Sequence, residues 1–235
     1  MEIRAGYEIS YDCPQPTPMI LTLSVHPSRI SDLLTLDRMR LDPPLPANTY
    51  HDSFGNFCHV IRAPAGRLTM SADFLVRDSG KLDAVAPQAE QHALEDLPVE
   101  VLLFLLGSRY CETDRLSSIA WSLFGQVPKG WPLVKAICDY VHDRITFGYE
   151  HASPTKTAFD AYTERRGVCR DFAHLAVSLC RCMNVPARYC TGYLGTSACR
   201  PTLARWISAL GLKFISETTG TRWMHGTIGR ASAAS

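Results

Sequence analysis

The stretch from Arg165 to Gly195 places a cysteine where a thiol can act as a nucleophile. Cys169 follows Gly167 closely and stands in the first turn of a segment with helical periodicity. The unpaired N–H groups and partial positive charge of a helix N-terminus stabilise an anion, and the thiolate is the nucleophilic form of cysteine. The glycine lets the backbone turn tightly and a substrate approach, and free N–H groups can hold an oxyanion. These features predict thiol acyl-transfer chemistry at Cys169.

The other cysteines supply the alternative interpretation, in which Cys169 is one of many small buried residues. The chain has nine cysteines, an odd number, and they are spread evenly. No secretory signal precedes them, so a disulfide framework is not expected. No C-x-x-C pair is matched by a second such pair or by a histidine pair, so we expect no metal site.

Four segments with helical or extended patterns are expected to position the thiol. Apolar residues recur at helical spacing from Cys169 to Met183, and Pro186 ends that pattern. A strand is predicted over 187–195 and another amphipathic helix over 131–145. The run "VEVLLFLLGS" is predicted to be a helix with Pro98 in its first turn.

The first part of the chain alternates with period two. "EIRAGYEISY" and "RLTMSADFLV" place apolar residues on one side, and "MILTLSV" and "NFCHVIRA" between them are strand-like. This pattern predicts an antiparallel β-sandwich and an α+β protein. We expect a β-rich domain over 1–92, a second domain over 93–195 and a distinct tail over 196–235.

The run "TERRGVCRDFAHLAVSLCRCMNVPARYCTGYLG" resembles the core of the bacterial transglutaminase-like superfamily. Members carry G-V-C-x-D-x-A-H-L on the nucleophile helix, then a Pro-Ala-Arg turn into a strand that ends in G-Y. The resemblance covers Met1 to Gly195 and implies a papain-like second domain with Cys169 as nucleophile. It implies amide hydrolysis or acyl transfer through a thioester, a peptide or protein amide as substrate, and no cofactor.

The resemblance also implies a histidine and an aspartate on the following strands, in segments like D-F-H-A-W and F-D-A-R-H-N. This sequence contains neither segment. The imidazole would take the thiol proton and the carboxylate would orient the imidazole. His174 lies about 140° around the helix from Cys169, so we do not expect it to face the thiol. We expect Gly167, Asp171 and His174 to play supporting roles, structural or in an oxyanion hole.

The tail after Gly195 lacks the alternation of apolar and polar residues that the strands of the family would show there. The loss of a single base near codon 195 explains this, because it shifts the reading frame. In the original frame, each codon, called here a hidden codon, joins the third base of one present codon to the first two bases of the next. Trp206-Ile207 forces a hidden aspartate, and Trp223-Met224 forces another one seventeen positions later, which is the spacing of the two family segments. The position that family members often fill with histidine cannot encode it even in the restored frame. We therefore predict a frameshifted tail and a truncated papain-like core.

Three functional hypotheses stay open. The first is an active thiol enzyme. The second, which we favour, is an inactive or severely impaired chain that keeps the nucleophile but lacks the His and Asp partners. The third is a non-catalytic module that binds a peptide or protein.

Composition narrows the class of partner and the compartment. The net charge of +1 gives no electrostatic reason to expect nucleic acid or an anionic membrane as partner. The longest apolar run, "VEVLLFLLG", is too short to span a bilayer. The N-terminus shows no basic region followed by an apolar stretch, so we expect a cytoplasmic location. No pattern indicates an oligomeric state.

Overall fold

The computed structural model of the chain describes residues 1–79, 87–192, 213–214 and 224–225. The chain divides into two compact units, Met1–Lys81 and Leu82–Ser235, called here the N-terminal and C-terminal units. Ala89 packs in the core of the C-terminal unit. The side-chain amide of Gln91 donates hydrogen bonds to the carbonyls of Met183 and Asn184 at 3.1 and 3.0 Å. The segment from residue 87 onward is therefore built into the C-terminal unit.

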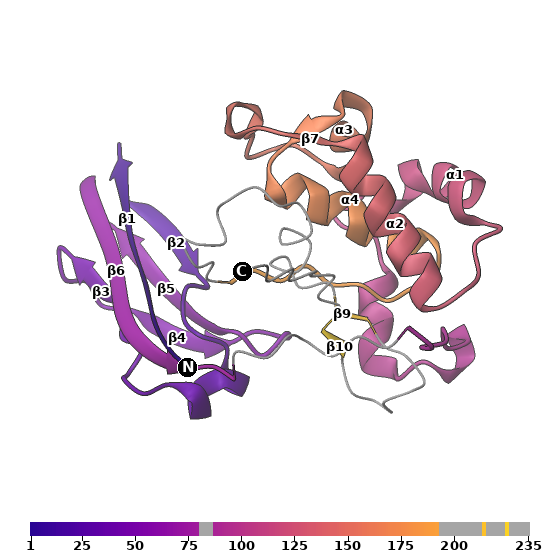
Figure 1. The fold of residues 1–235 in the computed structure, drawn as a ribbon. Helices are drawn as coiled ribbons and strands as arrows, with labels where there is room; N and C mark the ends of the chain where they lie inside the picture. The colour runs from indigo at the N-terminus through magenta and orange to yellow at the C-terminus, as the bar shows by residue number, and fades with distance from the viewer. Residues whose placement is uncertain (80–86, 193–212, 215–223, 226–235) are drawn as a thin grey trace, which may run out of the picture. The chain divides into compact units, whose positions relative to one another are not determined.

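The N-terminal unit consists of two antiparallel three-stranded sheets (Figure 1). The first has the order β1 (Glu2–Cys13), β6 (Gly66–Arg77), β3 (Arg40–Asp42). The second has the order β2 (Thr17–Leu21), β5 (Phe57–Ala63), β4 (Asn48–His51), and the 3-10 helix η1 (Pro27–Asp32) follows β2.

The core of this unit lies between the two sheets. Leu68 and Met70 of β6 pack with Leu21 of β2 and with Ile61 and Ala63 of β5. Burial alternates along β6, because successive side chains point to opposite faces of a sheet. The predicted antiparallel sandwich is confirmed, since each apolar sheet face is buried against the other sheet.

The C-terminal unit is mainly helical. Its α-helices are α1 (Thr113–Phe124), α2 (Trp131–Arg144), α3 (Ala158–Glu164) and α4 (Cys169–Cys182), and its 3-10 helices are η2 (Leu94–Asp96), η3 (Val99–Leu105) and η4 (Tyr149–His151). The short strands β7 (Thr146–Phe147) and β8 (Arg166–Gly167) pair in parallel, and β9 (Lys213–Phe214) pairs antiparallel with β10 (Met224–His225). In the described residues no helix combines the length and apolarity needed to cross a membrane.

Helix α4 is the central element of this unit, and α1, α2 and α3 all pack against it. The predicted apolar stripe is buried, but so is the rest of the helix from Asp171 to Cys180. A helix that is buried all round must satisfy its polar groups internally. The Ser178 hydroxyl does so by donating to the carbonyl of His174 at 2.7 Å.

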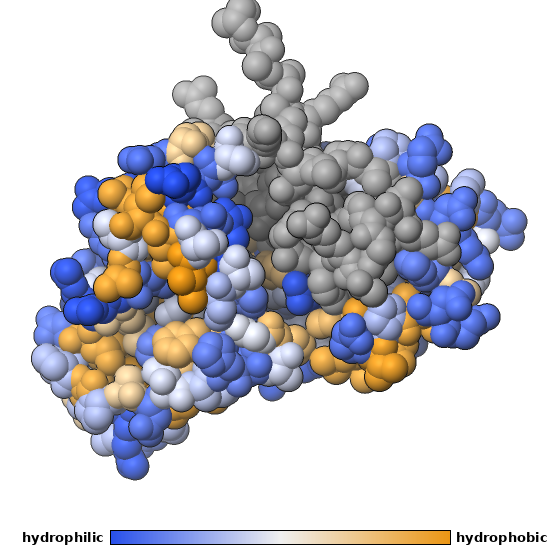
Figure 2. Space-filling view, turned by 90° about the horizontal axis from the view of Figure 1, so that it is seen from below, coloured by the Kyte–Doolittle hydropathy of each residue, from blue (hydrophilic) through white to orange (hydrophobic). Residues whose placement is uncertain are grey.

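The predicted helix over "VEVLLFLLGS" forms as the 3-10 helix η3. Pro98 is its N-cap, and the Pro98 carbonyl accepts the N–H of Val101, three residues on. Val101 and Phe104 are buried, whereas Val99 is 81% exposed. A space-filling view shows exposed apolar side chains in patches among polar ones (Figure 2).

The strand predicted over 187–195 does not form as an extended ladder in its described part, 187–192. Only Arg188 lies in a β-bridge there. The N–H of Ala187 donates to the carbonyl of Phe104, and the Ala187 carbonyl accepts from Arg181 Nε at 2.9 Å. Ala187 is thus bonded to η3 and to α4.

Candidate active site

Cys169 is the first residue of α4 and is half-buried. Of the eight cysteines in the described residues, only Cys169 and Cys190 are not fully buried, and all eight are free thiols. Burial raises the pKa of Cys138 to about 12 and that of Cys182 to about 11. The accessible thiol at the helix N-terminus therefore differs from the inert thiols of the core.

A side chain inside α4 fixes the turn that precedes Cys169. Asp171 is fully buried, and its Oδ2 accepts the backbone N–H of Val168 at 2.9 Å. A Cβ at residue 167 would lie 2.5 Å from that oxygen and 2.8 Å from Asp171 Cβ. Gly167 is thus needed for the close approach of the Asp171 side chain, and this carboxylate caps the start of α4.

Two backbone N–H groups beside the thiol have no partner among the described residues. The N–H groups of Asp171 and Phe172 both donate to the carbonyl of Val168, at 2.8 and 3.4 Å. Within the part of the chain that the structure describes, the N–H groups of Cys169 and Arg170 make no hydrogen bond. Unpaired N–H groups at a helix start, next to a nucleophile, can hold the oxyanion of a tetrahedral intermediate.

His174 lies in the protein interior, away from solvent. It is only 6% exposed, and its Nδ1 has no hydrogen-bond partner in the described residues. Burial, together with the positive charges of Arg170 and Arg181, lowers the pKa of His174 from 6.5 to about 4. The imidazole is therefore neutral at neutral pH.

No histidine of the described residues hydrogen-bonds to the Cys169 thiol. His142 Nδ1 lies 3.0 Å from Asp143 Oδ1, and His151 Nε2 lies 3.5 Å from Glu150 Oε1. His225 belongs to the two-residue strand β10, of which the structure describes the backbone. His142, His151 and His174 do not supply the imidazole that the resemblance implies.

Tyr189 lies against His174 of α4, a placement that sequence reasoning missed. Burial raises the pKa of Tyr189, and interaction with Cys169 raises it further. Its ring is 5.0 Å from the His174 ring, which in turn stacks on Tyr110 at 5.4 Å and an interplanar angle of 15°. The aromatic residue in "PARYC" was the available signal.

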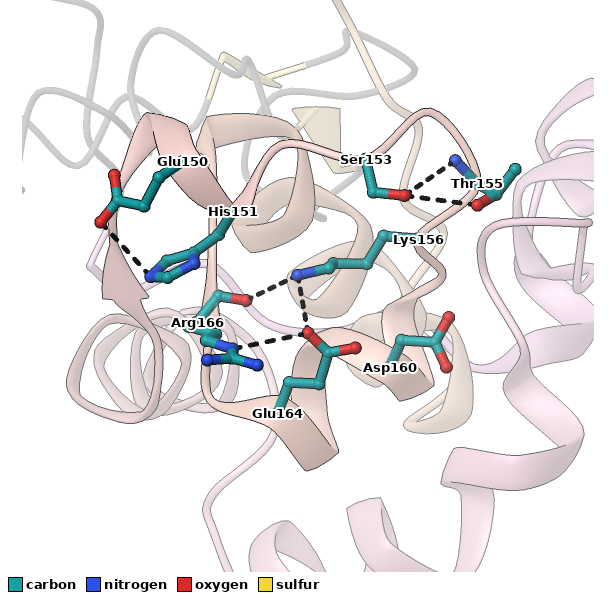
Figure 3. A pocket seen from close by; sticks show the side chains of 8 residues that line it. All are labelled: Glu150, His151, Ser153, Thr155, Lys156, Asp160, Glu164 and Arg166. Carbon is teal, nitrogen blue, oxygen red and sulfur yellow. Dashed lines mark hydrogen bonds and ion pairs between the residues drawn. The ribbon is translucent and has the colours of Figure 1, made fainter.

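A polar pocket of about 470 Å³ lies in the same unit (Figure 3). Its lining residues are all polar: Glu150, His151, Ser153, Thr155, Lys156, Asp160, Glu164 and Arg166. Cys169 is not among them. Arg170, next to the thiol, donates through Nη2 to the carbonyl of Ser153, which connects the pocket wall to the first turn of α4.

Comparison with known proteins gives a family and similar structures. The family model described as "Transglutaminase-like superfamily" matches residues 124–225. "Uncharacterized protein ML0607" of Mycobacterium leprae (strain TN) is 50% identical over 38 residues, which is 16% of this chain and 14% of that protein.

The chain is also similar to solved structures. The crystal structure of "a Putative Cysteine Protease from Cytophaga hutchinsonii" has a TM-score of 0.72 and 25% identity, covering 97% of this chain and 79% of that chain. The periplasmic domain of TgpA from Pseudomonas aeruginosa, bound to ethylmercury, has a TM-score of 0.36 and 20% identity, covering 83% and 59%.

The family match continues past Gly195 to residue 225, into the tail where sequence reasoning found no family pattern. Most of the predicted frameshifted segment lies outside the described residues, which there include only β9 and β10. The frameshift stays a prediction.

Proposed function

The chain belongs to the transglutaminase-like superfamily, and from this premise we propose that Cys169 is the nucleophile of amide hydrolysis or acyl transfer through a thioester. One observation carries the proposal: a half-buried thiol opens α4 beside two backbone N–H groups that have no partner in the described residues. Such a site supplies a stabilised thiolate and an oxyanion hole. The substrate class proposed is a peptide or protein amide.

We further propose that the chain, as it stands, has little or no turnover of unactivated amides. His142 and His151 lie beside acidic side chains, and His174 is buried and neutral, so none of them is bonded to the Cys169 thiol. General acid–base catalysis contributes about a hundredfold to ten-thousandfold to the rate of such reactions. A truncated core with a frameshifted tail is the proposed cause. Peptide binding without turnover would favour the alternative, a non-catalytic binding module.

We propose the cytoplasm as the compartment. The eight cysteines of the described residues are all free, which suits a reducing environment. Acidic and basic residues are nearly equal in number, with a net charge of +1, so electrostatics favours neither nucleic acid nor an anionic membrane as partner.

An activated ester tests the nucleophile separately from the acid–base partners. The phenolate of p-nitrophenyl acetate leaves without protonation, so acylation needs the thiolate but no general acid. We expect the acetyl group on Cys169, found by peptide mass mapping, and slow deacylation. A Cys190→Ala control should be acetylated like the natural chain and Cys169→Ala should not. Equal labelling of Cys169 and Cys190 would overturn the assignment.

A glutamine-containing peptide amide tests turnover. Substantial release of ammonia that disappears in Cys169→Ala would show an active enzyme and sink the proposal of impaired turnover. The genomic DNA around codon 195 tests the proposed frameshift directly.

A further inference from the structure

The strand that leads into α4 is hydrogen-bonded on one edge by a neighbouring strand. The carbonyls of Arg165 and Gly167 accept the N–H groups of Thr146 and Gly148, at 2.8 and 3.1 Å. In a β-ladder the carbonyl between two such groups points to the opposite edge. In the described residues no strand pairs with that opposite edge of β8.

Lys156 occupies this open edge. Its Nζ donates to the carbonyl of Arg166 at 3.2 Å and lies 2.8 Å from Glu164 Oε2 (Figure 3). The Lys156 side chain is only 6% exposed. A buried ammonium is tolerated when it is both paired and hydrogen-bonded, and here it is both.

The loop that carries Lys156 is also held to α4 and to the segment before α1. Arg170 Nη2 donates to the carbonyl of Ser153, and the Tyr110 hydroxyl donates to the carbonyl of Pro154 at 3.2 Å. The loop is thus hydrogen-bonded at Ser153, Pro154 and Lys156. Lys156 is the member of this set that acts on β8.

We propose that Lys156 is a positioning residue for Cys169, because its ammonium takes the place of a strand neighbour at Arg166 and so fixes the backbone that enters α4. Cys169 lies three residues after Arg166 in the sequence. Between them, the N–H of Val168 donates to the Asp171 carboxylate. The inference rests on the proposed function only in taking Cys169 as the nucleophile. On this proposal, the pocket that Lys156 lines serves to hold the backbone before α4 rather than to bind a ligand.

Lys156→Met tests the proposal, because it removes the ammonium and keeps a flexible stem. The measurement is the rate of iodoacetamide alkylation of the Cys169 peptide over a range of reagent concentrations, which is called here the alkylation profile and is read by mass spectrometry well below the melting temperature. We expect the rate at pH 7 to fall about threefold to tenfold, since a loosened first turn presents fewer ordered N–H groups to the reacting sulfur. A merely structural lysine would lower the melting temperature without changing this rate, and an unchanged rate would overturn the proposal.

Two variants serve as controls. Lys135→Met removes an exposed lysine that pairs with Asp139 on α2, and it should leave the alkylation profile unchanged. Lys156→Arg keeps positively charged donors and should restore a profile close to that of the natural chain. A Lys135→Met shift as large as that of Lys156→Met would show a general charge effect and overturn the proposal.

Glu164→Gln decides the matter if Lys156→Met does not fold. It removes the charge of the ion-pair partner, which is 41% exposed, and so leaves the buried ammonium without compensation and weakens its hold on the Arg166 carbonyl. Slower alkylation of Cys169 would support the tether, and an unchanged rate would overturn it. Failure of the proposed function has a different signature, equal acetylation of Cys169 and Cys190, so the two failures are distinguishable.

Discussion

At the scale of single residues, the site is defined by how side chains near the thiol are buried and satisfied. Asp171 uses its carboxylate for the N–H of Val168, and His174 uses its ring for stacking rather than for hydrogen bonds. Both residues belong to the family-like motif, and both contacts are structural. Two predictions follow from these contacts.

His174→Phe should make the stability of the protein depend less on pH between pH 7.5 and 4. The folded pKa of His174 is lowered to about 4 from 6.5, so the unfolded chain binds the proton first as pH falls. The contribution of neutral His174 to the free energy of unfolding is fully present above pH 6.5. It is lost progressively as the pH falls to 4, by about 3 kcal/mol in all. Melting temperatures at several pH values between 7.5 and 4 measure this loss. His142→Asn, at a half-exposed site, is the control, and an unchanged slope in His174→Phe would contradict the prediction.

Gly167→Ala should destabilise the protein by about 1–3 kcal/mol, because the new Cβ overlaps the Asp171 side chain. The Asp171 bond to Val168 should weaken with it. Urea unfolding measures the change. Gly192→Ala is the matched control, since a Cβ there meets nothing within 4 Å. Equal stability of the two variants would show that the turn has room that the structure does not show.

At the scale of elements, the end of α4 is joined to distant segments by one arginine. Arg181 Nη1 donates to the carbonyl of Leu106, just after η3, at 2.7 Å, and Nε donates to the carbonyl of Ala187 at 2.9 Å. The planar guanidinium can serve two carbonyls at once, which an ammonium on a shorter side chain does less well. This side chain helps to hold the segment that leads to Tyr189, together with the bond from the Ala187 N–H to the Phe104 carbonyl.

Arg181→Lys should therefore cost about 1–3 kcal/mol of stability, although the charge is kept. Amide hydrogen exchange should increase at Ala187, whose N–H bonds to Phe104. Arg4→Lys is the control, because Arg4 pairs with Asp73 at a site that is 76% exposed. If the two substitutions cost the same, the link between α4 and η3 contributes little.

At the scale of the whole molecule, two units with separate cores combine in one chain. The N-terminal core lies between two sheets, and the C-terminal core surrounds α4. The thiol, its free N–H groups and Lys156 all belong to the C-terminal unit. The family match reaches residue 225 of that unit.

Restoring the reading frame near codon 195 should raise the melting temperature. On the frameshift hypothesis, the restored frame would supply the two aspartate-containing segments, which the family resemblance places in strands, and the added strand pairing would stabilise the C-terminal unit. Calorimetry of this chain and of the repaired chain measures this. Repaired Cys169→Ala serves as the control for any turnover gained. Equal melting temperatures, or genomic DNA that encodes no such frame, would refute the frameshift.

The sequence by itself determined the α+β class, the sandwich, α2, α4 and the place of Cys169 in its first turn. These features rest on local periodicity and on end signals, which a chain carries wherever it folds. Only the tertiary structure decided that η3 is a 3-10 helix, that Gly167 makes room for Asp171, and that Lys156 lies on the open edge of β8. The sequence also did not predict that His174 stacks on Tyr110 and contacts the tilted ring of Tyr189. Such contacts join residues far apart in the sequence, and they depend on how α4 is packed on several sides at once, which no single segment encodes.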